Sequence, residues 1–235
     1  MNFKTIKIFF LLIILTALSA FGIIKNGDRS VNFDNLNFVN TNLRFISEDT
    51  VNKLLKQSDS FPSALQKRDL NLDKIEKLIE QNRFVRLAEI FLDLEGNIGI
   101  KIIEKDPVFR VLNENYYIDS SGSQMPVSDL FSKKTPLILS KVEKKHFDSL
   151  GVLGKFINMD SFLKNHISGL EMNSDSLVFY IKEFQYKIKM KGFQNFKERF
   201  NNYKFFYKSV YRDSLLPNLK SINLNFKNQV IVQKK

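Results

Sequence analysis

The 235-residue sequence contains no cysteine and no tryptophan, and it has only two histidines. Without cysteine there are no disulfide bonds, no Cys-ligated zinc and no thiol catalysis, and the redox compartment stays open. His146 and His166 have no His or Glu companion at a metal-ligand spacing, so we interpret both as ordinary surface histidines. The glycines form no nucleotide-binding loop and no nucleophile elbow. The sequence therefore predicts no catalytic, cofactor-binding or metal site, and no enzyme.

Two other polar groups have a simple structural interpretation. Asp119 in YYIDSSGS could be imagined as a catalytic acid, but Asp before Ser-Ser-Gly is typical of an Asx-type turn, which we favour. Glu76, Lys77 and Glu80 fall within one amphipathic segment and are most simply its solvated face.

The net charge of +11 is compatible with nucleic-acid binding, with an anionic membrane surface or with solubility alone. Lysine and arginine are spread along the chain without a dense basic run, so we expect no nucleic-acid binding. Aromatic residues alternate with lysines over residues 184–208, and we interpret them as a core-facing stripe with a basic outer face. With 43% apolar residues, the chain can bury the core of one large or two small domains.

One long apolar run lies near the N-terminus. Residues 8–24, IFFLLIILTALSAFGII, carry no charge, and about 17 residues at about 1.5 Å each make a helix near the lower limit for crossing a bilayer. Lys4 and Lys7 precede the run, so the positive-inside rule leaves residues 1–7 as a cytoplasmic tail. We predict a single transmembrane helix with the rest of the chain exported.

A cleavable signal peptide is the alternative. Small residues near positions 17–20 would suit a signal peptidase, but the apolar run is longer than a usual signal-peptide core and continues through Phe21, Ile23 and Ile24. A retained anchor is therefore favoured, and both interpretations export the bulk of the chain.

The first part of the exported chain predicts the order β-α-α-β-β. A strand enters a loop over residues 31–46, a helix capped by Ser47 ends near Ser58, and a second helix capped by Asn71 covers about 72–82. Two strands then flank a turn at residues 95–97, with Ile98, Ile100 and Ile102 on one face. The shifted parity of the first of these strands suggests a bulge near Ala88.

The second part, from Pro107, predicts short antiparallel strands followed by helices and further strands. We predict strands in PVFRVL, YYID and TPLILSKV, a helix over about 152–165, strands over about 168–173, 177–182 and 184–190, and a helix with Phe196, Phe200, Tyr203, Tyr207 and Val210 along one face. The terminal INLNFKNQVIVQKK divides into a strand Ser221–Phe226, a tight turn at Lys227–Asn228 and a last strand Gln229–Gln233.

Four stretches together resemble the FtsQ/DivIB family of bacterial cell-division proteins, in the form typical of Bacteroidetes. DLNLDKIEKLIEQNRFVRLAEIFLDLEGNIGIKIIEKDPVFRV is similar to the latter part of a POTRA module, and YYIDSSGSQMPVS to the start of the family's β domain. NNYKFFYKSVYRDSLLPNLKSINL resembles the family's long C-terminal helix and the strand after it, and NLNFKNQVIV resembles its ending. The resemblance covers nearly the whole chain.

The resemblance implies an α+β fold with a single N-terminal transmembrane helix, a POTRA module (β-α-α-β-β) and a mixed, mainly antiparallel β domain with flanking helices. The implied domains are a cytoplasmic tail (1–7), a transmembrane helix (8–24), a linker with the POTRA module (25–105) and the β domain (106–235). A protein of this kind is a non-enzymatic scaffold of the inner membrane, concentrated at the division septum with its bulk in the periplasm.

The partners implied by the resemblance are FtsB/DivIC-like and FtsL-like coiled-coil proteins and the septal peptidoglycan synthase complex, with no small-molecule substrate. A partner strand would pair with the edge strand Gln229–Gln233 by β-augmentation. We therefore expect a binding site made of Phe226, Lys227, Gln229, Val230, Ile231, Val232 and Gln233. Phe226 would be the aromatic anchor, and Ile231 the apolar residue on an otherwise polar outer face. Phe226, Val230 and Val232 could equally belong to the core.

Two other functions remain as alternatives. A POTRA-bearing periplasmic module for outer-membrane assembly or secretion would usually precede a membrane β-barrel, and the chain has no residues left to build one. An exported enzyme acting on cell-wall material would need a catalytic constellation that the sequence does not display.

Overall fold

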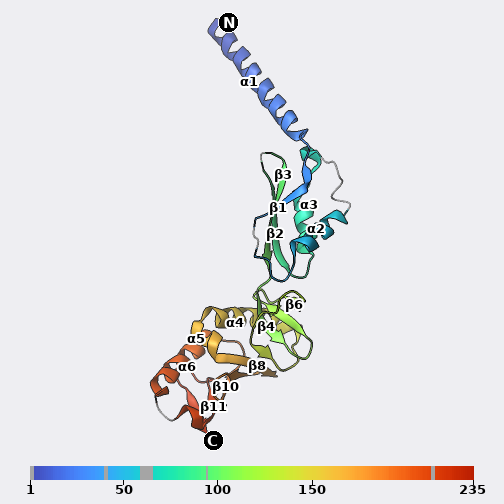
Figure 1. Cartoon of the computed structure of the whole chain (residues 1–235). Helices are drawn as coiled ribbons and strands as arrows, with labels where there is room; N and C mark the ends of the chain where they lie inside the picture. Colours follow the sequence, from blue (N-terminus) through green and yellow to red (C-terminus); the bar gives the residue numbers. More distant parts are fainter. Residues whose placement is uncertain (1–2, 40–41, 59–65, 94, 213–214) are drawn as a thin grey trace. The chain divides into compact units, whose positions relative to one another are not determined.

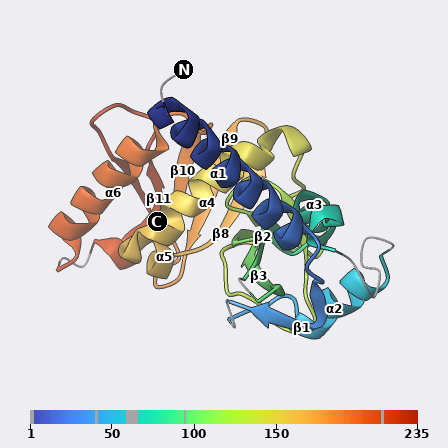
Figure 2. The same ribbon diagram turned by 90° about the horizontal axis from the view of Figure 1, so that it is seen from above.

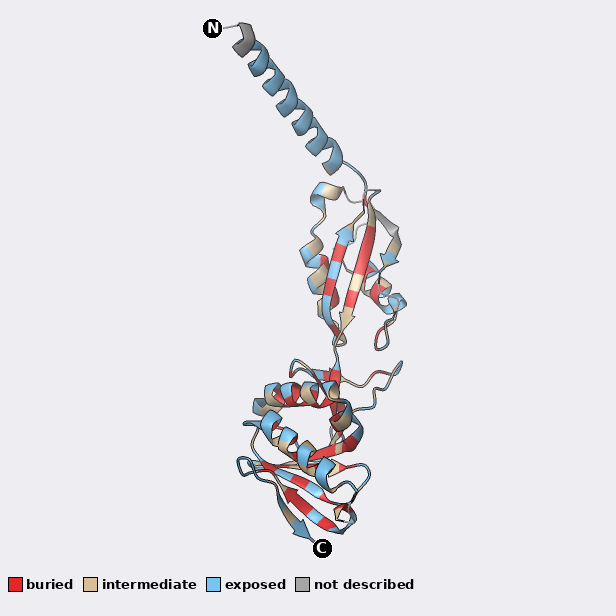
Figure 3. Cartoon of the chain, turned by 90° about the vertical axis from the view of Figure 1, so that its left-hand side faces the viewer, coloured by how far each residue is buried: buried red, intermediate tan, exposed pale blue. Residues whose placement is uncertain are grey.

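The computed structural model describes residues 3–39, 42–58, 66–93, 95–212 and 215–235. The chain divides into two compact units, Met1–Glu104 and Lys105–Lys235. Helix α1 (Phe3–Gly27) contains the one segment of the described residues long and apolar enough to span a membrane, Ile6–Gly27. Its apolar side chains from Ile8 to Ile24 are exposed along the whole helix (Figure 3). Such an N-terminal helix suits a single-pass membrane protein.

The rest of the first unit has the order β-α-α-β-β, as predicted (Figure 1). Its elements are β1 (Asn32–Phe38), α2 (Glu48–Lys56), the short 3₁₀ helix η1 (Lys67–Asp69), α3 (Leu72–Glu80), β2 (Val85–Leu92) and β3 (Asn97–Glu104). The three strands form a sheet in the order β1-β3-β2, in which β1 is parallel and β2 antiparallel to β3. Both outer strands are therefore edges of a small open sheet.

Both helix starts lie where the sequence predicts them. The Ser47 hydroxyl accepts a hydrogen bond from the Thr50 amide at 3.2 Å, and the Asn71 side chain accepts one from the Lys74 amide at 3.0 Å. Each cap satisfies a backbone donor that the first turn of a helix cannot pair internally, so both cap predictions are confirmed.

The core of this unit lies between the helices and one face of the sheet. Ile98, Ile100 and Ile102 are buried, as predicted, and pack in one cluster with apolar residues of α2 and α3. The predicted bulge exists, but the register shifts between Val85 and Leu87, slightly before Ala88. The shift lets both Val85 and Ala88 face the helices although they are three positions apart, a spacing that would put them on opposite faces of a regular strand.

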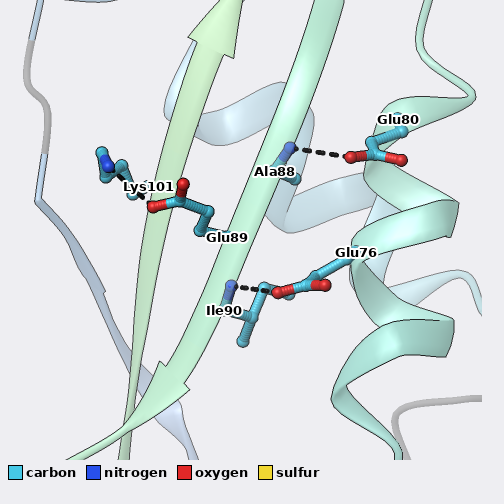
Figure 4. A network of polar contacts seen from close by, with 6 residues as sticks. All are labelled: Glu76, Glu80, Ala88, Glu89, Ile90 and Lys101. Atoms are coloured by element: carbon cyan, nitrogen blue, oxygen red, sulfur yellow. Dashed lines mark hydrogen bonds and ion pairs between the residues drawn. The ribbon is translucent and has the colours of Figure 1, made fainter.

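The prediction that Glu76 and Glu80 belong to the solvated face of α3 is wrong. Glu76 and Glu80 are half-buried, and their carboxylates accept hydrogen bonds from the backbone amides of Ile90 and Ala88 (Figure 4). Lys77 between them is exposed. The sequence could not reveal this, because the bonded amides belong to β2 and become neighbours only when α3 packs beside that strand.

Glu104, the last residue of β3, holds the segment before α2. Its carboxylate accepts hydrogen bonds from the amides of Arg44 (3.0 Å), Phe45 (2.7 Å) and Ile46 (3.1 Å). Three donors on one carboxylate bring together residues almost sixty positions apart in the sequence.

The second unit is built around one nine-stranded sheet. Its strands are β4 (Pro107–Val111), β5 (Tyr116–Asp119), β6 (Gln124–Pro126), β7 (Leu137–Ile138), β8 (Ile167–Asn173), β9 (Ser176–Ile181), β10 (Lys187–Lys191), β11 (Leu219–Asn223) and β12 (Ile231–Lys234), in the spatial order β12-β11-β10-β9-β8-β7-β4-β5-β6. Its helices are α4 (Phe147–Met159), α5 (Ser161–His166) and α6 (Phe196–Val210), with the 3₁₀ helices η2 (Lys144–His146) and η3 (Leu216–Asn218). The fold is therefore mixed α+β, as predicted.

The expectation that the early strands are all antiparallel is wrong for β7. This strand lies between β4 and β8 and is parallel to both. The chain reaches β8 from β7 through α4 and α5, and a helical crossover of this kind joins parallel strands, whereas a tight turn joins antiparallel ones.

The single helix predicted over residues 152–165 is two helices. Asp160 ends α4 and begins α5, with an extended backbone (φ −94°, ψ 114°). Its carboxylate accepts a hydrogen bond from the Leu163 amide at 3.0 Å and pairs with Lys204 of α6 at 2.6 Å. Asp160 therefore serves as the N-cap of α5, which a continuous helical pattern did not indicate.

The three helices lie on one side of the strands (Figures 1 and 2). Strands β9 and β10 alternate between buried and more exposed residues, whereas all four residues of β5 are buried. The predicted stripe of α6 is confirmed, because Phe196, Phe200, Tyr203 and Tyr207 are buried and Val210 packs against the same core. The opposite face of β10 exposes Lys187, Lys189 and Lys191.

Glu104→Ala should destabilise the first unit by about 2 kcal/mol, because hydrogen bonds to a charged group are among the stronger ones. Hydrogen exchange resolved to single amides should show faster exchange at Arg44, Phe45 and Ile46. Glu89→Ala, which removes an exposed ion pair with Lys101, is the matched control and should leave these amides protected. Unchanged protection in the Glu104 variant would contradict the assignment.

Candidate partner-binding edge

Strand β12, the last element of the chain, is one end of the nine-stranded sheet. It pairs antiparallel with β11, with Gln233 opposite Ser221, Val232 opposite Ile222 and Ile231 opposite Asn223. Among the described residues no further strand pairs with its other side. The backbone groups on that side are therefore available to a partner strand.

The terminal hairpin is shorter than predicted. β11 ends at Asn223 and β12 begins at Ile231, so Gln229 and Val230 precede the last strand and Phe226 and Lys227 lie in the turn region. Asn228 has a left-handed backbone (φ 58°), which asparagine tolerates better than most residues. A wider connection replaces the predicted tight turn. Within it the Asn223 side chain accepts a hydrogen bond from the Asn225 amide, and the Asn225 side chain accepts one from the amide of Lys191 at the end of β10.

The C-terminus is held in place by hydrogen bonds to the segment before β11. The amide of Lys235 donates to the carbonyl of Asn218 at 2.9 Å, and its ammonium group donates to the carbonyl of Pro217 at 2.9 Å. The Ser221 hydroxyl also bonds to the Gln233 side chain at 3.2 Å. These bonds fix β12 at the sheet although it ends the chain, where most strands fray.

The side chains of the predicted site divide between the core and the surface. Val230 and Val232 are half-buried and pack against the main core. Ile231 is 44% exposed and Gln233 is exposed, so both lie on the outer face. Phe226 is 48% exposed and belongs to no core cluster. The edge therefore offers one apolar side chain on its outer face and one aromatic ring at its turn.

Phe226 borders a small cavity of about 90 Å³ beside the start of α6. The residues lining it are Asn195, Glu198, Arg199, Asn202, Asn225, Phe226 and Lys227. Most of these side chains are polar, so an apolar group of a partner would meet Phe226 itself and find polar hydrogen-bonding groups around it.

The surface around the edge is basic. Residues 219–235 contain no acidic residue and include Lys220, Lys227, Lys234 and Lys235. On β10, Lys187 and Lys189 are in register with Ser221 and Asn223 of β11, so they lie on the same outer face as Ile231. Such a surface steers acidic segments toward it and raises their association rate.

The prediction that His166 is a surface histidine is wrong. The residue is 3% exposed, its Nε2 atom hydrogen-bonds to the hydroxyl of Tyr203, and its ring stacks on Phe162. Burial lowers the pKa of His166 to about 4, which outweighs the opposite effect of the Glu183 carboxylate. The tertiary fold buries it because α5 ends there against α6, which lies some forty residues later in the sequence.

His166 belongs to a buried group of tyrosines. Tyr203 bonds to Tyr186 through their hydroxyls at 2.7 Å, and Tyr207 donates to Glu183 at 3.2 Å. Burial raises the pKa of Tyr186 to about 12 and raises those of Tyr203 and Tyr207 as well. All three stay protonated at neutral pH, so they act as hydrogen-bonding parts of the core.

The remaining candidates have structural roles. The Asp119 carboxylate is buried and accepts from the amides of Ser121 (3.0 Å) and Ser123 (2.7 Å), which confirms the predicted turn. His146 is half-buried beside Phe193. Within the described ranges no three His, Cys, Asp or Glu side chains gather where they could hold a metal ion.

One family model matches within each of the two units. Residues 106–233 match the family model described as FtsQ/DivIB, C-terminal related, which covers more than half of the chain. The chain belongs to this family. Residues 39–103 of the FtsQ/DivIB-related chain match the POTRA-like domain. The predicted family is therefore confirmed, and so is the predicted order of a POTRA module followed by a β domain.

A comparison with solved structures matches the major extracytoplasmic domain of the trans isomer of the bacterial cell division protein DivIB from Geobacillus stearothermophilus. It is 9% identical to this chain, with a TM-score of 0.36, and the match covers 47% of this chain and 98% of that one. At this TM-score the likeness supports no inference. No curated protein matches the FtsQ/DivIB-related chain.

The stability of the second unit should fall in acid through His166. Its pKa is depressed in the folded state, so between about pH 6.5 and 4 the unfolded chain binds more protons and stability decreases as the pH falls. We expect wild type to lose about 2 to 3 kcal/mol more than His166→Gln between about pH 7.5 and 4.5.

All seven tyrosines lie in the second unit, so tyrosine fluorescence during urea unfolding reports on that unit. His146→Gln is the control and should keep the wild-type pH dependence. An equal loss of stability in wild type and His166→Gln would contradict the role of His166.

Proposed function

We propose that this FtsQ/DivIB-related chain is a non-enzymatic scaffold of the bacterial divisome that links early septal-ring proteins to septal peptidoglycan synthesis. The observation that carries the proposal is the open edge of β12 in the unit that matches the FtsQ/DivIB family. A free edge at the end of a rigid sheet suits the recruitment of a partner better than it suits catalysis.

The proposed arrangement in the membrane follows from the N-terminal helix. Residues 1–7 form the cytoplasmic tail, residues 8–24 cross the inner membrane, residues 25–105 contain a linker and the POTRA module, and residues 106–235 form the β domain. The basic residues before the span support a periplasmic location for both units. The protein concentrates at the division septum because its partners assemble there.

The proposed partners are FtsB/DivIC-like and FtsL-like coiled-coil proteins, through which the chain reaches the septal peptidoglycan synthase complex. A partner segment adds a strand to β12, and its alternating side chains meet Ile231 and Gln233 on the outer face. Lys227, Gln229 and Val230 contact the same segment where it passes the turn, and Phe226 anchors it. The half-buried Val232 holds the strand against the core.

The basic surroundings favour partners with acidic residues next to the added strand. The lysines at positions 187 and 189 lie on the outer face two strands away from β12, within reach of a segment that continues across the sheet. Electrostatic complementarity of this kind mainly raises the association rate and selects the partner.

Depletion of the protein in its own organism should block septation and give filamentous or chained cells. Expression of the full chain should restore division, whereas a chain that lacks residues 229–235 should reach the membrane and fail to do so. Microscopy with immunoblotting measures both results. Normal septation after depletion would contradict the proposed function.

A photoreactive amino acid at Gln233 should capture a short, single-pass coiled-coil protein in dividing cells. The matched control is Gln124, an exposed glutamine on β6 at the opposite end of the same sheet, which should capture no such protein. Mass spectrometry identifies the captured chain. Equal capture from both positions, or capture from Gln124 alone, would overturn the assignment of the binding edge to β12.

A further inference from the structure

Strand β2 of the first unit has the properties of an edge that pairs with other chains. It is eight residues long, VRLAEIFL, and only Arg86 and Glu89 carry charge. Leu87 is 40% exposed and Phe91 is 44% exposed on the face away from the helices. Long, apolar edge strands of this composition are templates for self-association, and proteins keep them only with some protecting device.

Two outward backbone donors of this edge already have partners. The amide of Ala88 donates to Glu80 Oε1 at 3.2 Å, and the amide of Ile90 donates to Glu76 Oε1 at 2.8 Å. Figure 4 shows both carboxylates reaching from α3 to β2. A second strand would need these same two amides in order to extend the sheet.

The spacing of helix and strand makes this arrangement possible. Glu76 and Glu80 are four residues apart, which is about 6 Å along a helix, and Ala88 and Ile90 are two residues apart, which is about 6.7 Å along a strand. The helix and the strand run in opposite directions, so Glu80 meets Ala88 and Glu76 meets Ile90. Two side chains of one helix face therefore match two successive outward amides of the strand.

We propose that Glu76 and Glu80 form a carboxylate guard that prevents β2 from pairing antiparallel with β2 of a second copy of the chain. The second copy is the occupant that fits best, because an identical strand would cover Leu87 and Phe91 with the same apolar residues. The guard directs strand addition away from this sheet. It goes beyond the proposed partner binding and does not depend on it.

The edge strand β12 of the second unit has no such guard among the described residues. The segment from β11 to the C-terminus, residues 219–235, has no acidic side chain to occupy its amides. The contrast between β2 and β12 points to a specific role of the two glutamates, since both edges belong to open sheets.

The test compares variants of the full chain in detergent by sedimentation equilibrium. Glu76→Ala with Glu80→Ala frees both amides, and we expect self-association to tighten by about tenfold or more. Glu76→Gln with Glu80→Gln keeps a carbonyl acceptor at each position and should behave as wild type. Asp49→Ala with Asp73→Ala removes two exposed carboxylates from the same unit and should also behave as wild type.

Crosslinking identifies the strand that pairs. The chain has no cysteine, so Glu89→Cys introduces a single thiol on the exposed face of β2. A short bismaleimide should then give covalent dimers in the alanine background and few in the wild-type background. The variant Leu87→Cys serves the same purpose if the two copies of β2 pair in a register that brings their Leu87 positions, instead of their Glu89 positions, close together.

Each result decides the proposal. Self-association of the folded alanine variant with crosslinking at position 87 or 89 supports it. A folded alanine variant no more associated than wild type overturns it, as does equal association of the glutamine variant or of the Asp49/Asp73 control. If circular dichroism shows that the double alanine variant is unfolded, the single variants Glu76→Ala and Glu80→Ala decide by the same measurements.

Discussion

Backbone N–H and C=O groups at the edges of open sheets must be paired, covered or left to a partner, and this constraint explains much of the architecture. The first unit satisfies two outward amides of β2 with carboxylates of α3. In the second unit the edge strand β6 is only three residues long and ends at Pro126, which has no amide hydrogen to donate. The edge strand β12 is anchored through Lys235 but keeps its outer side open. The edges therefore differ in how readily they accept another strand.

Several carboxylates in this protein satisfy backbone amides where regular pairing ends. Glu104 binds the segment before α2, Asp119 closes a turn, and Asp160 caps α5. A carboxylate accepts several hydrogen bonds at once, so it suits places where two or three amides converge. The exterior around β12 is basic, on a chain with a net charge of +11.

Local patterns were good predictors of the elements but poor predictors of the partners of polar side chains. Ser47, Asn71 and Asp119 bond within four residues of their own positions, and the sequence indicated all three. Alternation likewise indicated the buried Ile98, Ile100 and Ile102. His166, Glu76 and Glu80 bond to groups from eight to about forty residues away, and each was assigned to the surface. Nothing in the neighbouring residues distinguishes such a side chain from a solvated one.

The sequence by itself determined the apolar N-terminal helix, the β-α-α-β-β order of the first unit, the family and the position of a last strand, because these depend on hydrophobic periodicity, caps and the order of motifs. Only the tertiary structure decided that β7 is parallel to its neighbours, that Ile231 faces outward while Val232 packs on the core, and that β12 ends the sheet. The reason is that strand order and burial are set by which distant segments pack together. A strand of the same sequence could lie at the centre of a sheet or at its edge.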